Sequence, residues 1–168
     1  MSKFHLLKID SIEHNDSDGS ILWSMKNILN TFHLDGELFL LSVAFNTAAE
    51  IEVPSSYYLG LDARDTLSEE DQMVDLTNEP TTNGYARQAV SSLNGFDVEI
   101  NGGNYRAISG VVTFSASGGA WGPITNLFLC TTNTSSGYLI SSAKLASSRT
   151  LLDGQSITMR FSLGLQNS

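Results

Sequence analysis

The stretch that decides the fold class is SITMRFSLGL, residues 156–165. Large apolar side chains occupy every second position in it, at Ile157, Met159, Phe161, Leu163 and Leu165. Successive side chains of a β-strand point to opposite faces of a sheet, so this spacing predicts a strand with one buried face. Asp153-Gly154 lies just before it and provides residues that adopt the positive φ angles of a tight turn.

The same pattern continues upstream. Further strands are predicted at residues 85–90, 96–100, 107–115, 124–131 and 138–143, and turn-forming pairs such as Asn94-Gly95 separate them. Apolar runs at 38–45 and 57–61 also have the length of buried strands. No helical pattern separates the strands, which excludes a parallel α/β fold. The sequence predicts an all-β fold, an antiparallel β-sandwich or jelly roll of about eight strands.

Residues 1–36 differ from this pattern. Four apolar residues stand at the i, i+3, i+4 and i+7 positions of one helical face: Met25, Ile28, Leu29 and Phe32. Asp35-Gly36 is expected to end this helix. The predicted organisation is therefore an N-terminal arm with one short helix in residues 1–36, followed by a sandwich domain in residues 37–168. The same four residues are the predicted contacts with other subunits or with a larger assembly, because an apolar stripe must be covered.

The charge is unevenly distributed along the chain. The net charge is -9, with 15 acidic and 4 basic side chains in residues 1–80 but 3 acidic and 5 basic in residues 81–168. Proteins bind nucleic acid backbones through lysine and arginine, so the acidic balance argues against a nucleic acid partner. No run approaches the ~20 apolar residues of a membrane span, so no membrane partner is expected.

The motifs of common enzyme classes are absent from the sequence. It has no Gly-x-Ser-x-Gly elbow and no phosphate-binding glycine loop. The single cysteine, Cys130, lies in an apolar run and is expected to be a buried small hydrophobe. The histidines are expected to have packing or surface roles, and Asp16-x-Asp18-Gly19 is expected to form a polar turn. We therefore predict no enzyme activity, no cofactor and no metal site.

Three groups of residues leave other functions open. Trp121 is flanked by Gly118-Gly119 and Gly122-Pro123, which favours a buried plug at a turn over an exposed platform for stacking on sugars. Tyr57 and Tyr58 point to opposite faces of a strand, so one of them is expected in the core. An acidic surface loop is expected between residues 62 and 80. Its carboxylates could in principle include a glycosidase pair: Asp62, Asp65, Glu69, Glu70, Asp71 and Asp75.

An ordered set of short motifs resembles a family of phage virion structural proteins of β-sandwich type, which are tail-fibre-like or capsid-decorating. The motifs span residues 55–166 and are YYLGL (57–61), GYARQAV (84–90), VTF (112–114), WGPIT (121–125), GYLI (137–140), DGQ (153–155) and FSLGL (161–165). The resemblance implies a virion structural role without catalysis or cofactor. It also implies that Gly84 and Gly122 permit turns, that Trp121 and Phe161 fill the core, and that Arg87 pairs with a carboxylate.

The expected function is that of a capsid decoration or cement protein, made in the host cytoplasm and located in the virion. Its expected partners are the major capsid protein and copies of itself in a homotrimer, as the resemblance implies. The first alternative is a tail, baseplate or fibre-attachment protein. The second, from another class, is a carbohydrate-binding jelly-roll module that uses Trp121 or the Tyr57 and Tyr58 pair.

Overall fold

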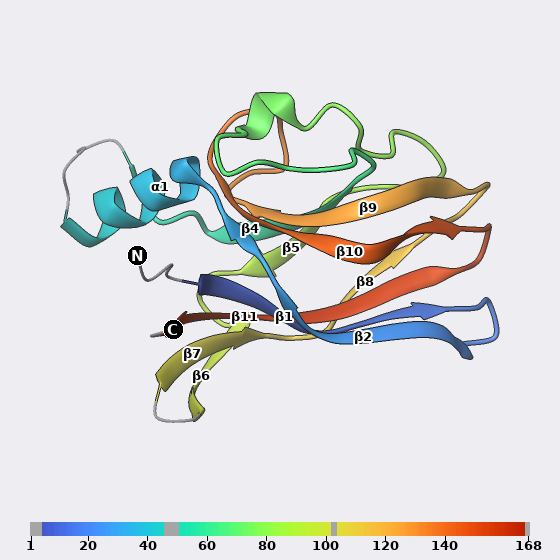
Figure 1. Cartoon of the computed structure of the whole chain (residues 1–168), viewed down its shortest axis with the longest axis horizontal. Coiled ribbons are helices and arrows are strands. Elements are labelled where there is room, and N and C mark those ends of the chain that lie inside the picture. Colours follow the sequence, from blue (N-terminus) through green and yellow to red (C-terminus); the bar gives the residue numbers. More distant parts are fainter. Residues whose placement is uncertain (1–4, 46–50, 102–103, 167–168) are drawn as a thin grey trace.

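The computed structural model describes residues 5–45, 51–101 and 104–166, which form two antiparallel sheets packed face to face (Figure 1). The first sheet, sheet A, has the order β2-β1-β11-β7-β6, with β8 also paired to β11. Its strands are β1 (His5–Asn15), β2 (Ile21–Leu29), β6 (Phe96–Asn101), β7 (Asn104–Ser109), β8 (Val112–Ser115) and β11 (Ser156–Gln166). The all-β sandwich predicted from the sequence is confirmed.

The second sheet, sheet B, has the order β3-β10-β9-β4-β5. Its strands are β3 (Thr31–Phe32), β4 (Ser56–Asp62), β5 (Gln88–Ser91), β9 (Trp121–Cys130) and β10 (Leu139–Leu151). The main core lies between the two sheets. There the alternating residues of β11 that predicted the fold, Ile157, Met159 and Phe161, are at most 2% exposed.

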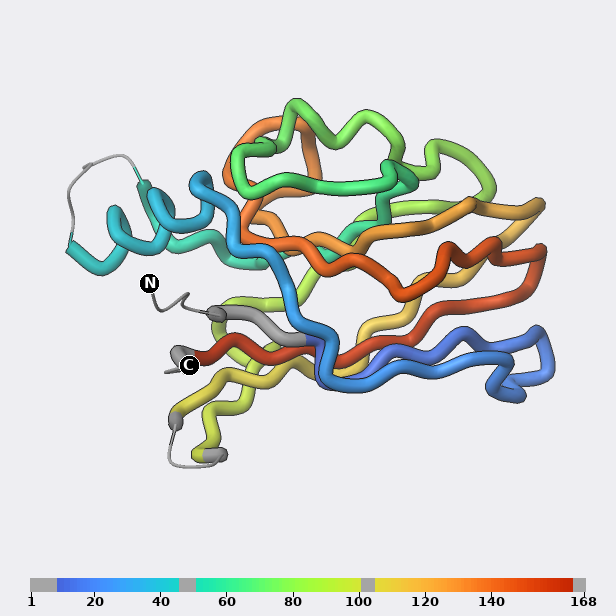
Figure 2. Tube along the Cα trace, viewed as in Figure 1, coloured from blue at the N-terminus to red at the C-terminus, as the bar shows by residue number. Residues whose placement is uncertain are grey.

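A second, smaller apolar cluster covers the outer face of sheet B. In β9, Leu127 and Leu129 belong to the main core, whereas Phe128 and Cys130 point to the other side of the sheet. The loop of residues 63–79 covers them with three apolar side chains, Leu67, Met73 and Leu76. Figure 2 shows this loop, in green, running over β9. It contains one short 3-10 helix, η1 (Met73–Asp75). The surface loop predicted from its acidity is therefore also a lid over sheet B.

The helix predicted in the first 36 residues is wrong, because residues 21–29 form strand β2. β1 pairs with both β2 and β11, so it is a central strand of sheet A and not a detached arm. Met25 and Ile28 both pack toward the core although they are three positions apart. Asn27 has a φ of 58°, and this irregularity shifts the strand alternation by one residue. The shift produced a spacing that imitates a helical face.

The strand predicted at residues 38–45 is also wrong, because residues 34–45 form the helix α1 (Leu34–Phe45). Short apolar runs fit a buried strand or a buried helix equally well. The helix is specified by features at its start: Asp35 and Glu37 lie in its first turn, where negative charge is favourable. Asp35 also accepts a 2.9 Å hydrogen bond from the backbone N–H of Leu139, which attaches the start of α1 to β10.

Two smaller differences concern strand ends. The strand predicted at residues 107–115 is divided into β7 and β8 around Gly110, and the strand predicted at 138–143 continues to Leu151.

Gly36 provides a test of how α1 docks. A Cβ atom at this position would overlap the backbone of Ile140 in β10, so no side chain fits between the helix and the sheet. We expect Gly36→Ala to lower the free energy of unfolding by about 1–3 kcal/mol, although alanine is the better helix former. Urea denaturation of both proteins measures the change. Gly110→Ala is the control, because nothing lies within 4 Å of a Cβ atom there. An equal loss in both variants would contradict the steric explanation.

Candidate functional site

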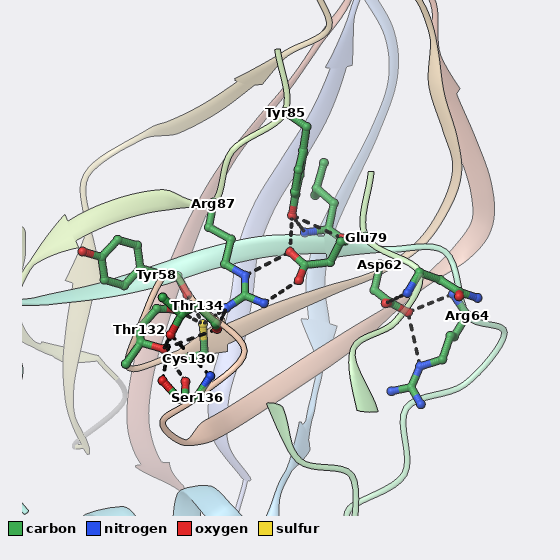
Figure 3. Close-up of polar contacts among 12 residues, drawn as sticks. Tyr58, Asp62, Arg64, Glu79, Tyr85, Arg87, Cys130, Thr132, Thr134 and Ser136 are labelled. Carbon is green, nitrogen blue, oxygen red and sulfur yellow. Dashed lines mark hydrogen bonds and ion pairs between the residues drawn. The ribbon is translucent and has the colours of Figure 1, made fainter. Parts of the chain in front are cut away.

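The most connected polar site of the described residues is centred on Arg87, beside the end of β9 (Figure 3). Its guanidinium pairs with both carboxylate oxygens of Glu79, at 3.0 Å from Nε to Oε2 and through a short contact from Nη2 to Oε1. Nη1 donates to the backbone oxygens of Thr132 and Thr134, at 3.1 and 2.6 Å. The pairing of Arg87 with a carboxylate is confirmed, and its partner is the loop residue Glu79.

Arg87 therefore joins three segments that are far apart in sequence. Its side chain is only 8% exposed, and its guanidinium carbon lies 5.1 Å from the centre of the Phe128 ring. The hydroxyl of Tyr85 donates to Glu79 at 2.8 Å and accepts from the N–H of Leu61 at 2.9 Å. The arrangement fixes the end of the 63–79 loop to β4 and to the turn after β9. Both charges of this network are paired with each other, so removing one partner would leave the other buried alone.

Cys130 lies next to this network and is fully buried. Burial raises the pKa of its thiol to about 11, so the thiol stays protonated near neutral pH. The prediction that Cys130 is a buried small hydrophobe is confirmed.

The other end of the same loop is anchored by Asp62, at the end of β4. Its carboxylate is fully buried and accepts hydrogen bonds from the backbone N–H groups of Arg64, at 2.8 Å, and Asn78, at 3.3 Å. The guanidinium of Arg64 lies 3.5 Å from Asp62 and 3.4 Å from Asp71. Figure 3 shows the contacts of Asp62 and Arg64 beside the Arg87 network.

Two further carboxylates of the hypothetical glycosidase set also bond their own loop. Asp71 accepts from the N–H of Ser68 at 2.6 Å, and Asp75 accepts from the N–H of Gln72 at 2.9 Å. Asp65 is 94% exposed and pairs with Lys144 at 3.1 Å. These contacts give Asp62, Asp71 and Asp75 a structural role in shaping the loop.

Trp121 lies at the start of β9 and is 3% exposed. Its indole N–H points to the backbone oxygens of Thr82 and Asn83, at 3.2 and 2.9 Å, and its ring meets Tyr85 edge to face. The preferred interpretation as a buried plug is confirmed. The hypothesis of an exposed sugar platform at Trp121 is wrong, because its ring has no open face.

The two neighbouring tyrosines of β4 both pack on apolar clusters. Tyr57 contacts the main core, where its ring meets Phe39 and Phe96, while Tyr58 packs on the cluster beneath the 63–79 loop. The expectation that only one would join a core is wrong, because the loop gives sheet B a second buried face.

The four residues predicted as subunit contacts do not share a face. Ile28 is 6% exposed, and Met25 and Phe32 are partly buried against the core. Only Leu29 is well exposed, at 62%. Three of the four therefore support the sandwich itself.

The exposed apolar surface that sequence reasoning missed lies on α1. Leu34, Leu38, Leu41 and Phe45 are between 52% and 71% exposed, and they stand four, three and four residues apart on one face. The spacing is visible in the sequence, but it lies within the apolar run 38–45, which also fits a buried strand. A second group, Val98, Ile100 and Tyr105, is exposed on the β6–β7 hairpin.

His33 is a buried titratable group between α1, β10 and the 63–79 loop. Its Nε2 lies 2.9 Å from the hydroxyl of Ser142, its backbone N–H donates to Ile140, and the next N–H, of Leu34, donates to Glu69. Burial lowers the pKa of His33 from 6.5 to about 4, although Asp71 acts in the opposite direction.

The lowered pKa of His33 predicts that the folded protein loses stability in acid. Between pH 6.5 and about 4 the unfolded chain binds a proton at His33 that the folded protein does not, so the free energy of unfolding falls as the pH falls. The contribution is about 3 kcal/mol across this window. His33→Gln retains a side-chain donor toward Ser142 but does not titrate. We expect urea denaturation at several pH values to give a flatter profile for this variant; parallel profiles would contradict the assignment.

Metal ligation and membrane insertion are two further possibilities for residues 5–45, 51–101 and 104–166. In these residues no three His, Cys, Asp or Glu side chains come together to hold a metal ion. No helix there is long and apolar enough to cross a membrane. Asp18 lies in the turn predicted around residues 16–19 and accepts a 2.8 Å hydrogen bond from the N–H of Ser20.

Comparison with known proteins gives the family. No curated protein matches the chain. A family model described as "Podophage GP4 fiber I protein gp80" matches residues 38–164, which include most of α1, the 63–79 loop, the strands β4 to β10 and most of β11. The match covers well over half of the chain, so this protein belongs to the podophage GP4 fiber I protein gp80 family and has a structural role in a phage virion.

Proposed function

We propose that this protein is a component of a phage tail fibre. The observation that carries the proposal is the family match over residues 38–164, since the family is described as a fibre protein. Two features of the structure support a structural role in an assembly. The 63–79 loop is fixed at both ends by buried ion pairs, and the outer face of α1 presents a row of exposed apolar side chains. Such a surface is typical of a protein that contacts other proteins.

The proposed role requires no catalysis and no cofactor. Its partners are other virion proteins and further copies of this chain. Capsid decoration, the role first expected from the sequence, is the alternative within the virion, and the two roles differ in where the protein lies and in how many copies are present.

Fractionation of purified particles tests the proposal. Virions are dissociated into heads and tails, the fractions are separated by sedimentation, and this chain is quantified by mass spectrometry against the major capsid protein. We expect it in the tail fraction, at a copy number far below that of the major capsid protein. Recovery with intact heads, at a copy number comparable to the capsid protein, would overturn the fibre role and support decoration.

A further inference from the structure

We propose that the outer face of α1 binds the same face of a second copy of this chain, as an antiparallel helix pair about a two-fold axis. The inference adds a partner to the proposed function, and it rests on that function only for its place in the virion. The interface consists of Leu34, Leu38, Leu41 and Phe45, which we call the α1 stripe.

The helix α1 carries apolar side chains on both its buried and its exposed side. Phe39 is 1% exposed, and Leu40 and Val43 also pack on the main core. The α1 stripe lies on the opposite side of the same twelve-residue helix. A surface helix of a monomer is ordinarily polar on its outer side, and a helix that is apolar all round is ordinarily buried. The α1 stripe therefore indicates an occupant.

The spacing of the α1 stripe fits a second helix as this occupant. Apolar residues spaced four, three and four apart keep one straight seam along a helix, which is the spacing that packs one helix against another. The spacing is the same in both directions along the chain. A two-fold axis midway along the helix therefore places Leu38 against Leu41 of the second copy and Leu34 against its Phe45. A second copy of α1 is complementary to the stripe without any further partner.

The charges beside the α1 stripe favour the antiparallel orientation. Glu37 is exposed beside Leu38, Asp35 lies in the same first turn, and the last turn has no basic residue. In a parallel pair the acidic first turns would lie together. In the antiparallel pair the two Glu37 residues are separated by about 7.5 Å along the axis and by an axis spacing of ~8–10 Å, so they lie more than ~10 Å apart. That exceeds the Debye length of about 8 Å at physiological salt.

The size of the interface sets its strength. Functional apolar patches on single proteins are on the order of 300–600 Å², so two such patches bury about 1,000 Å² in total. This is at the lower limit of biological interfaces. We therefore expect a weak dimer that forms in the micromolar range in solution and is favoured by the high local concentration of a virion.

The test begins with sedimentation equilibrium of the full chain over a range of concentrations. We expect a monomer–dimer equilibrium. Leu38→Lys places a charge in the seam and should raise the dissociation constant by ~100-fold, since each copy loses a buried leucine. Leu22→Lys in β2 is the matched control, because Leu22 is 51% exposed and Leu38 is 55% exposed. Leu41→Lys repeats the test if Leu38→Lys does not fold. A monomer at every concentration, a trimer, or an equal effect of the control overturns the proposal.

The orientation is tested by disulfide formation. Leu38→Cys and Leu41→Cys variants, carrying tags of different mass, are mixed and oxidised; the native Cys130 is buried. We expect the mixed dimer, which joins position 38 to position 41, to form faster than either like pair. Preferred joining of position 38 to position 38 would overturn the antiparallel arrangement. These measurements use the isolated chain, so they test the dimer and not the fibre role. The dimer can be absent while the fractionation of virions supports the fibre role, and the dimer can form while the fractionation contradicts it.

Discussion

Replacing Arg87 by alanine is expected to lower the free energy of unfolding by about 3–5 kcal/mol, the cost of leaving a buried charge without its partner. Arg87 is 8% exposed and its partner Glu79 is 14% exposed, so water can replace the lost contacts only in part. The variant also frees the backbone oxygens of Thr132 and Thr134 that Arg87 contacts. Urea denaturation at a fixed protein concentration measures the change.

Lys144→Ala is the control for this prediction. Lys144 also pairs with a carboxylate, that of Asp65, but the two side chains are 52% and 94% exposed. Solvent-exposed ion pairs contribute about 0–1 kcal/mol. The double variant Arg87→Met, Glu79→Met should lose less free energy of unfolding than the sum of the losses in the two single variants. The reason is that the double variant leaves neither charge buried alone. Additive losses would show that Arg87 and Glu79 do not act as a pair.

Replacing Trp121 by alanine is expected to lower the free energy of unfolding by about 3–5 kcal/mol, because the lost indole leaves a cavity. Trp121→Phe retains most of the packing but removes the N–H group that points to Thr82 and Asn83. We expect this variant to lose about 1–3 kcal/mol. Thermal and urea denaturation of the three proteins should therefore rank the wild type first, Trp121→Phe second and Trp121→Ala last.

Tyr105→Ala is the control for aromatic truncation, because Tyr105 is 70% exposed. We expect it to change the stability by no more than ~0.5 kcal/mol. A stable, fully folded Trp121→Ala protein would contradict the role of Trp121 as a plug.

The second half of the chain could be predicted well because its signals are local. The alternation from Ile157 to Phe161 and the turn at Asp153-Gly154 act on neighbouring residues, and both appear in the structure as expected. Trp121 was placed correctly for the same reason, since glycine and proline on each side describe a turn whatever the rest of the fold does.

The first half was predicted poorly because its structure depends on distant contacts. The positive φ of Asn27 lies within β2, which pairs with β1, and it changed a strand pattern into an apparent helical one. Most of the run 34–45 is apolar on both its buried and its exposed side, so periodicity could not distinguish a strand from a helix. The sequence also could not show which carboxylate pairs with Arg87. Glu79 reaches Arg87 only because the 63–79 loop folds over sheet B.

The closed 63–79 loop limits how this module can be oriented in a particle. A sandwich offers a neighbour two broad faces, but here the face of sheet B is occupied by the chain's own Leu67, Met73 and Leu76. Among the described residues, a flat partner can therefore contact the strands themselves on the side of sheet A, where Ser11, Lys26 and Arg160 lie in register across β1, β2 and β11. In the proposed fibre, a neighbour on the other side would meet the 63–79 loop and not the strands of sheet B.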